Sequence, residues 1–130
     1  MATTTVRLTI QSPDLTSDVL SISKAFNLTS ASGTGITQTS GLNRLDGLNS
    51  ITTIFKAADF SNDEAYLFVS NLAVSKAAGF QVELTQGSQK VAVIQAGDSI
   101  LMPIDPSALD IKLTAPTAST DVEYQLFHNG

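Results

Sequence analysis

The sequence predicts an all-β fold, an antiparallel β-sandwich or a jelly-roll-like barrel, built by residues 1–130 as a single domain. Apolar and polar residues alternate with a period of two along much of the chain, as at Phe80–Leu84, which is the pattern of a strand with one buried face. Turn residues separate these runs at intervals of about 8 to 12 residues, which is typical of sandwiches and barrels. A chain of 130 residues, 42% of them hydrophobic, can bury a sizeable core.

The expected strands follow one another along the chain with little room for helix. They cover residues 6–10, 20–28, 51–57, 65–69, 80–84, 91–94, 100–104, 109–113 and 122–126. Ala65–Val69 is an unbroken apolar run, which indicates a strand covered on both faces. Helical signals are limited to one turn at 14–18 and to a short helix or loop at 70–77, because neither segment continues a 3.6-residue stripe.

Turn chemistry marks the ends of these runs. Gln86–Ser88 predicts a tight hairpin, because its glycine can adopt a positive φ. Similar turn residues occupy 61–63, 78–79, 96–98, 105–107 and 115–117. The regular spacing of strands and turns after residue 64 indicates a meander, in which each strand pairs with the next.

Residues 30–50 break this regularity and are expected to form a long irregular loop or arm in the N-terminal half. One interpretation is a surface loop with an irregular edge strand; the other is an arm that orders on a neighbouring subunit. Leucines recur at every third position from Leu42 to Leu48 and would give such an arm an apolar contact. The candidate partner-binding residues are Thr3, Thr4, Thr5, Leu42, Arg44, Leu45 and Leu48.

Charge and cysteine content exclude several classes of function. The formal net charge is −5 and the seven basic residues are scattered, whereas nucleic-acid binding needs a concentrated basic patch. No apolar run approaches the roughly 20 residues that span a bilayer, so no membrane partner is expected. Met1–Thr5 shows no secretory signal. The chain has no cysteine, and therefore no disulfide and no thiolate metal site.

No set of residues indicates catalysis, and we expect no catalytic residues, no cofactor and no metal. His128 lies near the end of the sequence, where a ring is hard to hold in place for general-base chemistry. The carboxylates sit mostly in turns, where their side chains bond backbone N–H groups. Calcium binding by the oxygen ligands of 59–64 stays open, although the spacing does not match an EF-hand. Gly33–Gly35 lacks the context of a phosphate-binding loop.

Several blocks in the C-terminal two-thirds of the chain follow the same order of turns and short apolar strands as one known group of proteins. These blocks are Glu64–Asn71, Gly79–Leu84, Ala96–Ile104, Leu109–Leu113 and Asp121–Leu126. In this pattern the chain resembles small virion proteins of tailed bacteriophages, including those that infect cyanobacteria. The resemblance covers about residues 64–127.

The resemblance implies a capsid decoration, or cement, protein, or else a minor tail component. Such a protein would be made in the host cytoplasm, bind the outside of the capsid and stabilise contacts between subunits of the major capsid protein. It would associate with itself as a dimer or trimer and need no cofactor. The alternative is a tail-associated β module that binds a host surface or carbohydrate. That alternative is disfavoured because sugar sites use exposed aromatic residues and only 6% of this chain is aromatic.

Overall fold

The computed structural model describes residues 3–12, 20–29, 36–60, 65–76 and 79–129. The described elements are strands, apart from a 3-10 turn, η1 (Ala57–Asp59). The strands are β1 (Thr3–Ser12), β2 (Leu20–Thr29), β3 (Ile36–Leu45), β4 (Ser50–Phe55), β5 (Ala65–Asn71), β6 (Val82–Gln86), β7 (Gln89–Ile94), β8 (Ser99–Ile104), β9 (Ile111–Ala115) and β10 (Thr120–Asn129). The predicted all-β fold is confirmed.

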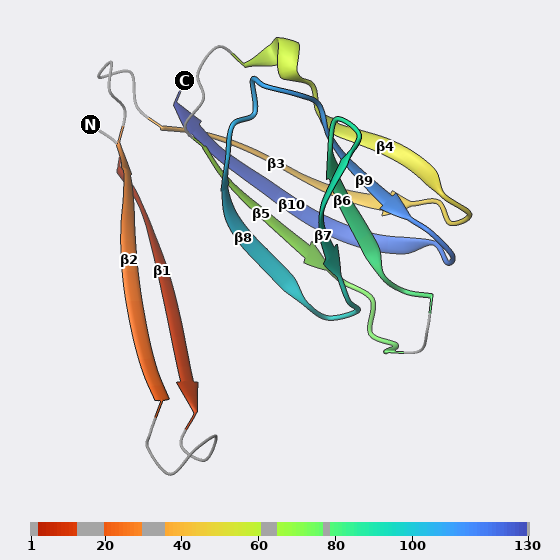
Figure 1. The fold of residues 1–130 in the computed structure, drawn as a ribbon, viewed down its shortest axis with the longest axis horizontal. Helices are drawn as coiled ribbons and strands as arrows, with labels where there is room; N and C mark the ends of the chain where they lie inside the picture. The colour runs from red at the N-terminus through yellow and green to blue at the C-terminus, as the bar shows by residue number, and fades with distance from the viewer. Residues whose placement is uncertain (1–2, 13–19, 30–35, 61–64, 77–78, 130) are drawn as a thin grey trace.

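Strands β3 to β10 form two packed antiparallel sheets, and β1 and β2 form a separate hairpin (Figure 1). One sheet has the order β3-β10-β5-β8 and the other β4-β9-β6-β7. Strands at the same position in the two orders are consecutive in the sequence: β3 and β4, β10 and β9, β5 and β6, and β8 and β7. Eight strands in two sheets with this connectivity make a jelly roll, one of the two predicted architectures.

The predicted meander is wrong. Within the sandwich, β6 and β7 are the one pair of consecutive strands that hydrogen-bond to each other among the described residues. Their two-residue turn is Gly87–Ser88, with Gly87 at a φ of +61°, as the hairpin prediction required. The remaining connections cross from one sheet to the other, because strands with one apolar face bury that face by packing sheet on sheet.

The core lies between the sheets and takes inward residues from all eight strands. On β5 burial alternates along the strand, with Leu67 and Val69 fully buried and Tyr66 and Phe68 half-buried on the outer face. The prediction that Ala65–Val69 is covered on both faces is therefore wrong within the described chain. The buried hydrophobic set is Leu45, Phe55, Ala65, Leu67, Val69, Val82, Leu84, Ile94, Ile104, Ile111, Leu113, Ala115, Val122 and Leu126.

The irregular loop or arm predicted at 30–50 is wrong over most of its length, and only the edge strand of the first interpretation agrees with the structure, since β3 lies at the edge of its sheet. Residues 36–45 are strand β3, which pairs with β10 along ten residues, and the chain then turns at 46–49 into β4. The alternation is absent because the positions in phase with the buried Leu45 are Thr37, Thr39, Gly41 and Asn43. At Gly41 a Cβ would collide with the ring of Tyr124 on β10. Residues 30–35 and the helical turn expected at 14–18 lie outside the described residues.

Candidate interaction surface

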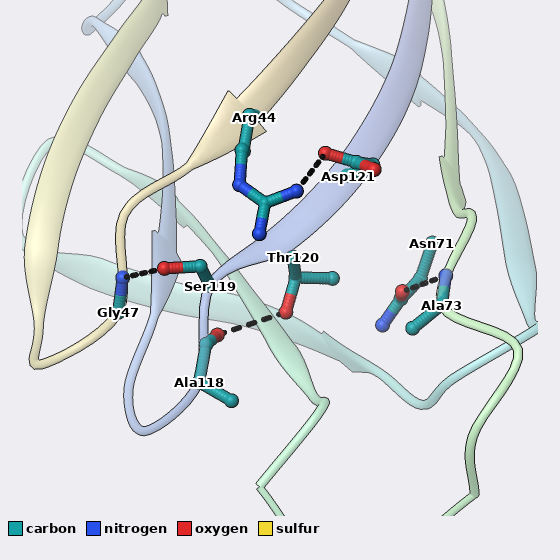
Figure 2. A network of polar contacts seen from close by, with 8 residues as sticks. All are labelled: Arg44, Gly47, Asn71, Ala73, Ala118, Ser119, Thr120 and Asp121. Carbon is teal, nitrogen blue, oxygen red and sulfur yellow. Dashed lines mark hydrogen bonds and ion pairs between the residues drawn. The ribbon is translucent and has the colours of Figure 1, made fainter.

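One end of the sandwich gathers the 46–49 turn, the segment that follows β5 and the 116–119 turn between β9 and β10. The backbone N–H of Leu48 donates to the carbonyl of Thr117 at 3.3 Å, and the N–H of Gly47 donates to Oγ of Ser119 at 3.1 Å (Figure 2). A Cβ at position 47 would lie 2.5 Å from the Thr117 carbonyl oxygen, so this approach requires glycine. The two turns are thus fixed against each other.

Leu48 is held in an unfavourable conformation at the tip of this end. Leu48 and Asn49 both have a φ of +63°, in the left-handed region. Asparagine tolerates that region, whereas for leucine it costs about 1 kcal/mol. The Leu48 side chain is also 85% exposed. A strained backbone that displays an apolar side chain to solvent does not stabilise the monomer, so Leu48 is a candidate for contact with another molecule.

The neighbouring segment, 72–76, is anchored by a buried amide. The side-chain nitrogen of Asn71 donates to the carbonyls of Phe80, at 2.7 Å, and Ile94, at 3.0 Å. Its side-chain oxygen accepts the N–H of Ala73 at 3.0 Å (Figure 2). Asn71 is 1% exposed and its hydrogen bonds are made, so it joins β5 to the ends of two strands of the opposite sheet without leaving an unpaired polar group.

Beside this anchor lies a shallow groove, which we call the Leu72 groove. Its walls include Arg44, Leu72, Val74, Phe80 and Asp121. Val74 is 99% exposed, and Arg44 pairs with Asp121 at 3.4 Å across the surface (Figure 2). The groove offers aliphatic contact beside a neutralised ion pair. This combination suits a protein surface better than a strongly charged ligand.

The structure separates the predicted contact residues into three groups. Leu42, Arg44 and Leu48 are exposed at or near this end of the sandwich, and Thr5 is exposed on the distant β1. Leu45 is fully buried in the core, so the prediction that it contacts a partner is wrong. The every-third-residue pattern misled because strand side chains alternate with a period of two. Thr3 and Thr4 lie in β1, but their side chains are outside the described part.

Leu72 and Val74 were not among the predicted contacts. Sequence reasoning assigned 70–77 to a short helix or loop, and a valine in such a segment carries no signal of exposure. The structure fixes the start of the segment through the hydrogen bond from the Ala73 N–H to Asn71, and Val74 beyond it is exposed.

The sequence raised two candidates for chemistry, His128 and a calcium site at 59–64. Within ranges 3–12, 20–29, 36–60, 65–76 and 79–129, no group of three His, Cys, Asp or Glu side chains is placed to hold a metal. His128 packs edge-to-face on Phe60, with ring centroids 5.0 Å apart. Of the calcium candidates at 59–64, residues 61–64 lie outside the described chain. No helix in the part of the chain that the structure describes is long and apolar enough to cross a membrane.

No family model and no curated protein matches this chain. Among solved structures, the chain is similar to one described as Bacillus endospore appendages that form a family of disulfide-linked pili. The sequences are 11% identical, the match covers 72% of this chain and 88% of the other, and the TM-score is 0.44. The jelly-roll assignment rests on the strand order of this chain and not on that likeness.

Proposed function

We propose that this chain is a structural virion protein, a decoration protein that binds the outside of a phage capsid and stabilises contacts between major capsid protein subunits. The observation that carries the proposal is the exposed and strained Leu48, whose turn is hydrogen-bonded through Gly47 to Ser119 at the wall of the Leu72 groove. Exposed apolar side chains on a fixed turn suit docking on another folded protein. The protein would then be made in the host cytoplasm and reside on the capsid surface.

The architecture supports this proposal without deciding it. Jelly rolls occur in viral capsid proteins, but also in lectins and cupins, and a fold does not assign a function. The sequence resemblance to small phage virion proteins points the same way. The alternative, a tail-associated module that binds a host surface or carbohydrate, uses the same fold class.

The chemistry of the exposed surface favours a protein partner over a sugar. The most exposed large hydrophobic residues of the described chain are all aliphatic, whereas the outer-face aromatics Tyr66, Phe68 and Phe127 are half-buried. The exposed aliphatic residues are Leu8, Ile10, Leu42, Leu48, Ile51, Leu72, Val74, Val91, Val93, Leu101 and Leu109. Sugar rings stack on aromatic faces, whereas aliphatic side chains gain their binding energy by being buried against another apolar surface.

Co-sedimentation with empty capsids assembled from the cognate major capsid protein tests the proposal. We expect the wild-type chain to saturate the capsids. Leu48→Asn should keep the fold, because asparagine accepts a positive φ, and should weaken binding about tenfold, or about 1.4 kcal/mol. Val93→Asn is the matched control. Val93 is an exposed aliphatic residue of β7, in the sheet β4-β9-β6-β7, and its substitution should leave binding unchanged.

A glycan array run with the same preparations tests the alternative. Sugar binding in the absence of capsid binding would overturn the decoration proposal. Capsid binding that Leu48→Asn and Val93→Asn affect equally would contradict the assignment of this end of the sandwich.

A further inference from the structure

The hairpin β1–β2 lacks the packing that would stabilise it. It stands off the sandwich (Figure 1), and among the described residues its strands pair extensively only with each other. A two-stranded hairpin by itself is marginally stable in water. Leu8 and Ile10, two residues apart on one face of β1, are 47% and 43% exposed. This face therefore needs a cover from outside the hairpin.

The hairpin strands are also basic where the sandwich is acidic. Their charged residues are Arg7 and Lys24, both exposed, and Lys24 is the register partner of Leu8. The two carboxylates of residues 1–35, Asp14 and Asp18, belong to the connection between the strands, so residues 36–130 carry the whole formal charge of −5. The net charge of residues 36–130 is thus opposite in sign to the charge of the hairpin strands.

The outer face of the sheet β3-β10-β5-β8 has the matching apolar surface. Phe68 on β5 is half-buried there and pairs in register with Leu101 on β8, which is 42% exposed. Tyr66 pairs in the same way with Phe127 on β10. An outer sheet face in contact with water is usually polar, so this apolar row indicates a face that is covered in the assembled protein.

A hollow on the same face supplies the carboxylate. It is lined by Gly41, Leu42, Leu72, Glu123 and Gln125. Glu123 is half-buried between aliphatic side chains, and no ion pair of Glu123 or of Lys24 is found within the described residues. Since a hydrogen bond between an ammonium and a carboxylate is stronger than a neutral one, the exposed Lys24 is a suitable partner for Glu123.

The two surfaces also match in length. Strands β1, β2 and β10 each contain ten residues and therefore each span roughly 33 Å. A hairpin laid along β10 would cover the apolar row and the hollow together.

We propose that the hairpin of a second copy of this chain lies on the outer face of the sheet β3-β10-β5-β8. Leu8 and Ile10 pack on the row that contains Phe68, and Lys24 pairs with Glu123. A second copy is the occupant because the chain's own hairpin stands away from this face, and because exchange of hairpins within a closed oligomer gives every hairpin and every face a partner. This inference does not depend on capsid binding.

Charge reversal tests the pairing in the full chain without capsids. Sedimentation equilibrium over a concentration series measures self-association of the wild type, Lys24→Glu, Glu123→Lys and the double variant. We expect the wild type to self-associate, each single reversal to weaken association at least tenfold, and the double variant to recover to within about threefold. A monomeric wild type would overturn the proposal, as would a double variant no stronger than the single ones.

A second pair of variants tests the apolar contact. Leu8→Asn should weaken self-association at least tenfold, while Thr9→Asn, at the adjacent exposed position on the opposite face of β1, should leave it unchanged. Circular dichroism of each variant verifies the fold. Equal effects at the two positions would contradict docking through this face. Capsid binding by a monomer would retain the decoration proposal and exclude this one.

Discussion

The hairpin β1–β2 and the strand β6 show the same alternation of apolar and polar residues, yet they end in different environments. On β6, Val82 and Leu84 are fully buried between two sheets. On β1, Leu8 and Ile10 are about half exposed, because within the described residues β1 and β2 form a sheet only with each other. Alternation therefore specifies that a strand has an apolar face, but not whether the cover for that face lies in the same chain.

Truncation of one leucine in each region gives the largest expected contrast. Leu67→Ala should lower the free energy of unfolding by about 3 kcal/mol, because it leaves a cavity in the core. Leu8→Ala, in protein dilute enough to be monomeric, should lower it by less than about 0.5 kcal/mol. Urea denaturation followed by circular dichroism measures both. Equal losses would show that the hairpin is packed within the monomer.

The buried amide of the sandwich gives the next largest effect. Asn71→Ala removes the partners of the Phe80 and Ile94 carbonyls and of the Ala73 N–H, and should cost about 2 kcal/mol. Asn43→Ala, at an exposed position of β3, is the control and should change stability by less than about 0.5 kcal/mol. The same denaturation measurement compares them. A loss at Asn71 no larger than at Asn43 would mean that the amide does not anchor the 72–76 segment.

The ion pair at the candidate surface should contribute least. Arg44 and Asp121 have side chains 68% and 54% exposed, so Arg44→Ser should cost less than about 0.5 kcal/mol of unfolding free energy. The loss should shrink further as salt is added, since water and ions screen the pair. Denaturation at low and high ionic strength measures this difference. A loss above 1 kcal/mol that salt does not reduce would show a structural role for the pair.

Sequence reasoning located most strands of the sandwich but not the strand that carries the candidate contacts. Strands such as β6 and β9 have inward apolar residues at every second position, and their local pattern is sufficient. Strand β3 shows no alternation in the sequence because Thr37, Thr39, Gly41 and Asn43 hold the positions in phase with the buried Leu45. The reason for the glycine, room for the ring of Tyr124, is visible only when β10 lies beside β3.

The predicted contact residues show the same limit of a local pattern. Leu42, Arg44 and Leu48 are exposed, and their contact with a partner stays a prediction, whereas Leu45 of the same set is buried. In a strand, side chains three residues apart point to opposite faces of the sheet, so leucines at every third position do not line one surface. Leu72 and Val74 were missed because their exposure depends on the hydrogen bonds of Asn71, which join residues up to 23 positions apart.

The sequence alone determined that the chain is all-β, where most strands and the Gly87 turn lie, and that no cysteine chemistry is available. These properties follow from side-chain periodicity and turn conformation, which act over a few residues. The tertiary structure alone decided the jelly-roll order, the burial of Leu45, the exposure of Leu48 in a strained turn and the isolation of the hairpin. Each of these depends on which strands meet across the two sheets, and that is set by packing between residues far apart in the chain.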